Sequence, residues 1–335
     1  MKLQDFGYDL PQELIAQYPV QKRDQARLMA VNRATGMITH DVFANLGKYL
    51  PSQSLLVLNN SKVLPVRLLG KRPTGGNVEV LLLRKLSDGV SFEALIKPLG
   101  RLKMDEKIVF NGSDVYAQLI DPQKKIVRFN QKNIESYLKR IGHMPLPPYI
   151  KRPDEPLDRA MYQTVYAKVP GSVASPTAGL HFTPELLKSL KEAGHTIEKV
   201  TLHVNYATFK PVQEDDITRH EMYFEDYSVP AKSLESITAA RKAGRTIIAV
   251  GTTSCRVLET LAGGGKPRGA TNIFIYPGFE FKMTDVLITN FHLPFSTLLM
   301  LTYAFGGTEL MRRAYDEAIA RRYRFYSYGD CMFIL

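Results

Sequence analysis

The sequence contains no tryptophan, only two cysteines, and no long apolar run. Cys255 and Cys331 have neither a metal-binding spacing nor a disulfide framework, which is typical of a reduced cytoplasm. The longest apolar run, residues 298–305, is too short to span a bilayer. The N-terminal residues 1–6 resemble neither a signal peptide nor a lipidation motif. We therefore expect a cytoplasmic protein with no membrane partner.

Several catalytic motifs are also missing. The chain has no Walker loop, no dinucleotide-binding glycine fingerprint and no nucleophile elbow. His220 and Glu225 could serve in acid–base work, but no third metal ligand follows at a suitable spacing, so no metal site is expected. These absences weigh against a nucleotide-dependent dehydrogenase, a serine hydrolase of the elbow type and a zinc enzyme.

Positive charge is abundant. The formal net charge is +11 and the pI is about 9.4, which favours a polyanionic partner, most simply a nucleic acid. The 17 tyrosines and 16 phenylalanines could stack on bases, although most are expected in the core. The arginines at 312, 313, 321, 322 and 324 are assigned to a late helix, where they either contact a nucleic-acid backbone or form a solvated face.

The hydrophobic pattern divides the chain into three parts. Residues 1–62 predict a hairpin and a buried strand at 55–58. Residues 63–149 contain short strand patterns about every ten residues, which predicts a small antiparallel barrel. Residues 150–335 alternate helices and strands. We predict an α/β fold: an α/β layered domain with an inserted small antiparallel β-barrel domain, the proline-rich residues 144–156 returning from the barrel.

The individual elements follow from turn and breaker residues. The predicted barrel strands are 66–70, 78–84, 92–96, 107–110, 115–120 and 126–129, with turns that include 111–113 and a closing helix at 134–141. The predicted helices of the last part are 184–193, 231–243, 256–261 and one from 296 to about 323 with a break at 306–307, and its strands are 200–204, 246–250, 272–276 and 286–289.

The segment Gly171–Thr183 is a candidate ligand-binding loop, because many of its residues are small or polar and glycine and proline interrupt regular structure. It offers the hydroxyls of Ser172, Ser175 and Thr177, and a titrating group in His181. Thr183 followed by Pro184 predicts a helix N-terminus, which favours an anionic group nearby. A ligand-binding loop and a loop that merely caps a helix are both consistent with this pattern.

Two further segments place polar residues between a strand and a helix. Residues 250–258 contain Gly251, Thr252, Thr253 and Ser254 after an apolar strand, where α/β sheets bind ligands, although ordinary helix capping by Thr253 or Ser254 is the alternative. Residues 290–296 follow another strand in the same way. His292 could carry a proton or contact a base there, or be a hydrogen-bonded structural histidine.

Taken together, these motifs resemble the S-adenosylmethionine:tRNA ribosyltransferase-isomerases of queuosine biosynthesis. The resemblance covers nearly the whole chain and rests on several motifs in the same order. They are Asp5-Phe-Gly-Tyr-Asp-Leu-Pro11, Tyr162-Gln-Thr-Val-Tyr166, Gly171–Thr183, Val250–Ser254, Phe274-Ile-Tyr-Pro-Gly278, Thr289–Pro294, Ser296-Thr-Leu-Leu-Met300 and Arg324-Phe-Tyr-Ser-Tyr-Gly-Asp330. The family architecture, an α/β domain with an inserted barrel, agrees with the change of pattern at Val63.

The resemblance implies a transferase of tRNA modification and processing. S-adenosylmethionine is consumed as a substrate, so no cofactor and no metal are expected. Its ribosyl part is transferred to 7-aminomethyl-7-deazaguanine at the tRNA wobble position and isomerised, which gives epoxyqueuosine and releases adenine and methionine. We expect a monomer. A base must remove the acidic 5′ proton beside the sulfonium, and His181, His203 and His292 are the candidates.

The candidate site residues follow from these motifs. The predicted catalytic residues are His181, His203, His292, Ser172 and Thr177. The predicted substrate-binding residues are Ser175, Gly179, Thr183, Asn205, Thr208, Glu225, Gly251, Thr252, Thr253, Ser254, Arg256, Tyr276, Pro277, Gly278, Asn290, Phe291 and Ser296. The predicted tRNA-binding residues are Lys62, Arg67, Arg321, Arg322 and Arg324.

The sequence departs from the family pattern at three places. Asn205 and Tyr206 stand where glycines are usual, Tyr223 stands where a histidine is usual, and residues 59–62 read Asn-Asn-Ser-Lys in place of Asn-Asp-Thr-Arg. One alternative is therefore a tRNA-binding protein of the same fold with reduced or no catalytic activity. A methyltransferase that uses S-adenosylmethionine is disfavoured, because its glycine-rich motif is missing.

Overall fold

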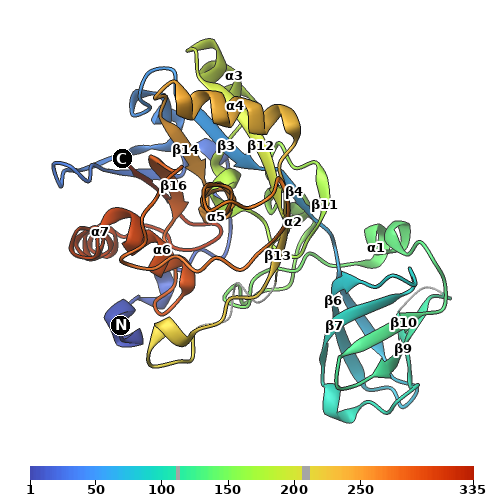
Figure 1. The fold of residues 1–335 in the computed structure, drawn as a ribbon. Coiled ribbons are helices and arrows are strands. Elements are labelled where there is room, and N and C mark those ends of the chain that lie inside the picture. Colours follow the sequence, from blue (N-terminus) through green and yellow to red (C-terminus); the bar gives the residue numbers. More distant parts are fainter. Residues whose placement is uncertain (111–113, 206–211) are drawn as a thin grey trace. The chain divides into compact units, whose positions relative to one another are not determined.

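A computed structural model of the chain describes residues 1–110, 114–205 and 212–335 (Figure 1). It contains two compact units. The first comprises Met1–Lys62, Pro147–Arg152 and Met161–Leu335, and the second comprises Val63–Leu146 and Pro153–Ala160. The predicted turn at 111–113, the predicted site residue Thr208 and Tyr206, one of the departures from the family pattern, lie outside the described residues. The predicted fold class, a mixed α/β fold with a closed antiparallel barrel, is confirmed.

The first unit is built on a nine-stranded sheet in the order β15-β13-β12-β3-β14-β16-β17-β1-β2. Its strands are β1 (Arg27–Val31), β2 (Ile38–Val42), β3 (Leu55–Asn59), β12 (Thr196–Leu202), β13 (Glu225–Ser228), β14 (Ile247–Val250), β15 (Arg268–Thr271), β16 (Val286–Asn290) and β17 (Cys331–Ile334). Four central strands, β12, β3, β14 and β16, run parallel, so their carboxyl ends meet at one edge.

The central strands are buried on both faces, as their continuous apolar runs require. Leu55 and Val57 belong to one core cluster, whereas Leu56 and Leu58 belong to the other. The helices of the unit, in chain order, are α3 (Pro184–Glu192), α4 (Ala231–Lys242), α5 (Thr252–Ala262), α6 (Thr297–Gly306) and α7 (Thr308–Ala320). Side chains of α4, α5, α6 and α7 enter the first cluster and those of α3 enter the second.

The second unit is a closed barrel in the order β10-β7-β6-β5-β8-β9, and all of its strand pairs are antiparallel. The strands are β5 (Arg67–Lys71), β6 (Asn77–Lys85), β7 (Ser91–Lys97), β8 (Lys107–Phe110), β9 (Tyr116–Asp121) and β10 (Ile126–Phe129). All six match predicted strands. The ring of Phe129 lies 5.5 Å from that of Phe92 and 5.9 Å from that of Phe110, which fills the interior with aromatic carbon. Two short helices, α1 (Glu135–Ile141) and α2 (Pro156–Met161), and the small sheet of β4 (Ser61–Val63) and β11 (Val169–Ser172) complete the fold.

Three local predictions are wrong. Residues 272–276 form no strand; the strand is β15 at 268–271, which pairs with β13, and Ile273, Phe274 and Tyr276 pack on the core instead. Helix α5 begins at Thr252 rather than at Arg256, and no side chain caps it. The basic residues 321–324 lie beyond the end of α7 and not within it.

Candidate functional site

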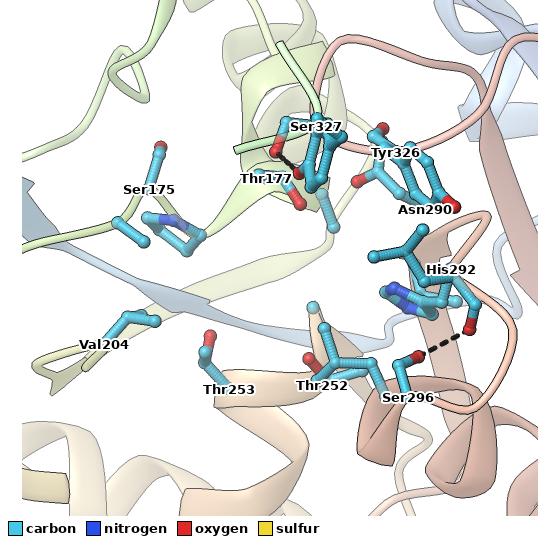
Figure 2. A pocket seen from close by; sticks show the side chains of 18 of the residues that line it. Ser175, Thr177, Val204, Thr252, Thr253, Asn290, His292, Ser296, Tyr326 and Ser327 are labelled. Atoms are coloured by element: carbon cyan, nitrogen blue, oxygen red, sulfur yellow. Dashed lines mark hydrogen bonds between the residues drawn. The ribbon is translucent and has the colours of Figure 1, made fainter. Parts of the chain in front are cut away.

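The carboxyl ends of β14 and β16 open into a cavity of about 810 Å³, counting the part that faces solvent. Every lining residue belongs to the first unit. Figure 2 shows hydroxyl, amide and imidazole groups around it. The lining residues are Tyr149, Ala174, Ser175, Pro176, Thr177, Ala178, Val204, Gly251, Thr252, Thr253, Thr289, Asn290, His292, Leu293, Pro294, Ser296, Leu298, Tyr326 and Ser327.

A buried asparagine joins the strand ends beneath the cavity. The Asn59 side chain accepts from the amide of Leu202 at 3.1 Å and donates to the carbonyl of the same residue at 3.0 Å. It also donates to Thr253 Oγ1 at 3.2 Å. Because Asn59 is fully buried and both ends of its amide are paired, it ties β3, β12 and α5 into one frame.

The first turn of α5 faces this cavity. Gly251, at φ 88°, lets the chain turn from β14 directly into the helix. The helix N-cap makes no side-chain hydrogen bond, so the first backbone N–H groups have no capping side chain. Thr252 and Thr253 add two hydroxyls to the lining. This end of α5 is suited to an anionic group such as a carboxylate.

Asn290, at the end of β16, has a forced orientation. Its Nδ2 donates to the carbonyls of Tyr326 at 3.0 Å and Asp330 at 3.4 Å, and lies 3.2 Å from His181 Nε2. Carbonyl oxygens only accept, so the amide nitrogen must occupy this side. Oδ1 is then buried with no hydrogen-bond partner, although Asn290 lines the cavity. A buried, unpaired acceptor is costly unless a ligand donates to it.

His292 lines the cavity and is held on several sides. Its Nε2 lies 2.7 Å from Thr289 Oγ1, its backbone N–H donates to Tyr315 Oη at 3.0 Å, and Tyr8 Oη donates to its carbonyl. Burial lowers the pKa of His292 to about 3, so the imidazole is neutral at pH 7. It is therefore fixed and neutral at pH 7.

An aromatic wall closes another side. The Tyr149 and Tyr326 rings lie 4.6 Å apart between centroids, and Tyr149 Oη is hydrogen-bonded to Ser327 Oγ. Ser175 adds a buried hydroxyl that has no hydrogen-bond partner. The cavity thus combines aromatic carbon with unsatisfied polar atoms, which is typical of small-molecule sites.

Eight predicted site residues come together in this cavity. They are Ser175, Thr177, Gly251, Thr252, Thr253, Asn290, His292 and Ser296. Ser296 also caps α6 through a 3.2 Å contact with the Leu299 amide.

Two predicted catalytic histidines do not line the cavity. His181 lies behind Asn290 in a separate small hollow. Burial, with Arg23 and Arg324 nearby, lowers its pKa to about 3. The His203 ring packs so closely on Gly171, at φ 136°, that a Cβ there would lie 2.9 Å from it. Burial also lowers the pKa of His203.

Other predicted residues support the fold around the site. Ser172 Oγ donates to Ser61 Oγ at 3.0 Å and accepts from the Val204 amide at 2.9 Å. Glu225 accepts from Arg256 in a buried ion pair and from the Asn205 amide at 2.9 Å. The remaining predicted residues, Gly179, Thr183, Ser254, Tyr276, Pro277, Gly278 and Phe291, are also absent from the lining, and Thr183 caps α3 as predicted.

The predicted tRNA-binding cations are distributed over both units. Lys62 is exposed on β4. Arg67 pairs with Glu79 in the barrel at 2.8 Å, and Arg321 pairs with Glu317 at 2.9 Å. The other two cations contact the N-terminal segment. Arg322 lies 3.8 Å from Glu13, and Arg324 donates to the Tyr18 carbonyl.

Sequence reasoning missed the aromatic wall. Tyr149 lies in the proline-rich crossing, and Tyr326 and Ser327 lie in the family-like motif 324–330. That motif is the signal in the sequence that points to Tyr326 and Ser327. In the parts of the chain that the structure describes, no cluster of three or more His, Cys, Asp or Glu could hold a metal ion, and no helix is long and apolar enough to cross a membrane.

Comparison with known proteins gives consistent matches. A family model described as "Queuosine biosynthesis protein" matches residues 3–334. The S-adenosylmethionine:tRNA ribosyltransferase-isomerases of Sulfurihydrogenibium sp. and Carboxydothermus hydrogenoformans are 51% and 47% identical, over the whole of both chains. The crystal structure of S-adenosylmethionine tRNA ribosyltransferase from Thermotoga maritima is 37% identical with a TM-score of 0.57, covering 99% of this chain and all of that one.

Proposed function

Because the chain belongs to the queuosine biosynthesis family of S-adenosylmethionine:tRNA ribosyltransferase-isomerases, we propose that the cavity at the strand ends holds S-adenosylmethionine and the acceptor base. The enzyme transfers and isomerises a ribosyl group onto tRNA. The proposed acceptor is 7-aminomethyl-7-deazaguanine at the wobble position, and the proposed products are epoxyqueuosine-tRNA, adenine and methionine. The proposal includes a cytoplasmic monomer in which S-adenosylmethionine is a consumed substrate and no resident cofactor or metal takes part.

The observation that carries this placement is the presence of two unpartnered polar atoms in the lining residues, Asn290 Oδ1 and Ser175 Oγ. Asn290 Oδ1 needs an N–H donor, and the exocyclic amine of adenine is one. The Tyr149 and Tyr326 rings offer aromatic carbon against which the purine can pack. The start of α5 suits the carboxylate of the methionyl part. These groups complement both ends of S-adenosylmethionine.

His292 is the proposed proton acceptor, because it lines the cavity, whereas His181 and His203 do not. In the proposed course a proton leaves the 5′ carbon beside the sulfonium and adenine departs. The substrate amine then bonds to the unsaturated sugar, and a sugar oxygen closes the epoxide as the carbon–sulfur bond breaks and methionine leaves. The hydrogen bonds of Asn59 hold the end of β12 and the first turn of α5 in position beside the reacting groups.

Chromatography of the products tests this function. The protein is incubated with S-adenosylmethionine and tRNA that carries the 7-aminomethyl precursor. Adenine and methionine, formed in step with ribosyl label on the tRNA, support the proposal. S-adenosylhomocysteine would indicate methyl transfer, because a methyltransferase leaves adenine attached to ribose. Intact S-adenosylmethionine would indicate a tRNA-binding protein without catalytic activity. A variant with Asn205→Gly, Tyr206→Gly and Tyr223→His would then test whether the departures from the family pattern abolished the activity.

A further inference from the structure

A second hollow, a groove with about 850 Å³ of empty space when the part open to solvent is counted, lies between the N-terminal segment and the proline-rich crossing of the first unit. Residues that line it include Gln17, Tyr18, Tyr149, Lys151 and Arg152, together with one carboxylate, Glu13, which lies 3.8 Å from Arg322. None of the predicted site residues lines this groove.

Gln17 fixes the shape of the groove. Its Nε2 donates to the Tyr149 carbonyl at 3.0 Å and its Oε1 accepts from the Lys151 amide at 2.8 Å. The backbone carbonyl of Gln17 accepts from Arg152 Nε at 3.0 Å. Both ends of one amide are used to align two segments that are more than a hundred residues apart, so the groove is organised before any partner binds.

The groove presents a stacked aromatic and cationic pair. The Arg152 guanidinium lies 4.0 Å from the centre of the Tyr18 ring, and Tyr18 is 47% exposed. Lys151, also exposed, adds a second cation, and Arg324 donates to the Tyr18 carbonyl. An exposed tyrosine with a stacked guanidinium and a neighbouring lysine is the combination that binds an unpaired base and its phosphate.

The groove and the cavity have one lining side chain in common. Tyr149 lines both hollows, and its ring packs on Tyr326 in the cavity wall. Because one side chain borders both hollows, the groove is within reach of the nucleotide next to a target base that enters the cavity.

We propose that this groove binds the nucleotide next to the modified one in the tRNA anticodon loop, with its base on the Tyr18–Arg152 pair and its phosphate near Lys151. The inference rests on the proposed function, since it needs a target base in the cavity. It adds a second point of recognition, which depends on an unpaired neighbouring base that can leave the stack of the loop, and not on the target base itself.

The test is a double-mutant cycle on anticodon stem–loop binding. Two probes carry an abasic site on the 5′ or on the 3′ side of the target, and the proteins are wild type and Tyr18→Ala. With the wild type, one abasic probe should bind roughly 10-fold more weakly, the value of about one stacked base. Tyr18→Ala should bind the intact probe about as weakly as the wild type binds that abasic probe. Its affinity should not fall further when the abasic probe replaces the intact one. Independent, additive losses would overturn the proposal, as would unchanged binding by Tyr18→Ala.

Further measurements separate this inference from the proposed function. The KM for S-adenosylmethionine should stay unchanged in Tyr18→Ala while the KM for tRNA rises, and equal rises in both would contradict the proposal. Lys151→Ala should reduce the salt dependence of tRNA binding by about one counterion, whereas Lys191→Ala, an exposed lysine on α3, should not. Failure of wild-type turnover would count against the proposed function, while the binding cycle would still decide the role of the groove.

Discussion

The two units bury different kinds of side chain. In the described part of the barrel unit, the buried residues are apolar apart from Ser91 and Asp158. At the strand ends of the α/β unit, by contrast, hydroxyl, amide and imidazole groups are buried together, and Ser175 Oγ and Asn290 Oδ1 lack partners. Buried polar groups without partners reduce stability, so the two in the cavity lining are candidates for hydrogen bonds to a ligand.

The largest predicted effect is on turnover at His292. His292→Ala should lower kcat by roughly 10²–10⁴-fold, because it removes the proposed proton acceptor from the cavity. The measurement is steady-state turnover with precursor tRNA, together with thermal unfolding to show that the variant is folded.

His195 provides the control for that variant. It is also a buried histidine, but it precedes β12 and does not line the cavity. His195→Ala should retain most of the wild-type kcat. Equal losses in the two variants would contradict the assignment of the chemistry to the cavity.

In the barrel we expect a large loss of stability with little kinetic consequence. Phe129→Ala removes a ring that contacts both Phe92 and Phe110, and should cost about 3–5 kcal/mol of unfolding free energy. Below the unfolding temperature, affinity for S-adenosylmethionine should match the wild type. A loss of that affinity in the folded variant would show that the barrel contributes to the cavity.

Stability should also depend on pH through the two buried histidines. His181 and His292 have folded pKa values of about 3, whereas an unfolded histidine has a pKa near 6.5. The unfolded chain therefore binds more protons between these values, so stability is complete above about pH 6.5 and falls as the pH decreases. At pH 5 each histidine should cost on the order of 2 kcal/mol.

Denaturant unfolding at several pH values checks this expectation. His292→Gln should show a shallower decline between pH 6.5 and 4 than the wild type, because Gln does not titrate. An identical decline in both proteins would show that folding does not lower the pKa of His292.

The smallest effect separates two serines of one segment. Ser175 Oγ has no protein partner, so Ser175→Ala should leave stability unchanged and lower kcat/KM about 10-fold if the hydroxyl meets a ligand. Ser172 Oγ joins Ser61 to Val204, so Ser172→Ala should instead lower stability by about 1–3 kcal/mol. The opposite assignment of the two effects would reverse the roles given to these hydroxyls.

Local chemistry explains why much of the fold is predictable from the sequence. Thr183 before Pro184 specifies a helix start, and Thr183 Oγ1 indeed accepts from the Leu186 amide at 3.1 Å. The barrel strands are separated by turn residues at short range. Strand β17 was not predicted, because it is the pairing of residues 331–334 with β16 and β1, and not a local pattern, that defines it.

The site was predictable only in part, for a related reason. Gly251 and Asn290 follow apolar strands, and parallel strand ends meet at one edge, so their grouping follows from topology. Ser172, Ser175 and His181 come from the same polar segment, and nothing in the sequence distinguishes the one that lines the cavity from the two that do not. That distinction depends on tertiary packing against Ser61 and Asn290.

The most direct test of the account is the location of bound S-adenosylmethionine, measured by crystallography of the protein with that ligand. We predict the ligand in the cavity of the α/β unit, with an adenine amine within hydrogen-bond distance of Asn290 Oδ1 and the carboxylate at the start of α5. Ligand bound elsewhere, or in the cavity with Asn290 Oδ1 still unpartnered, would contradict it.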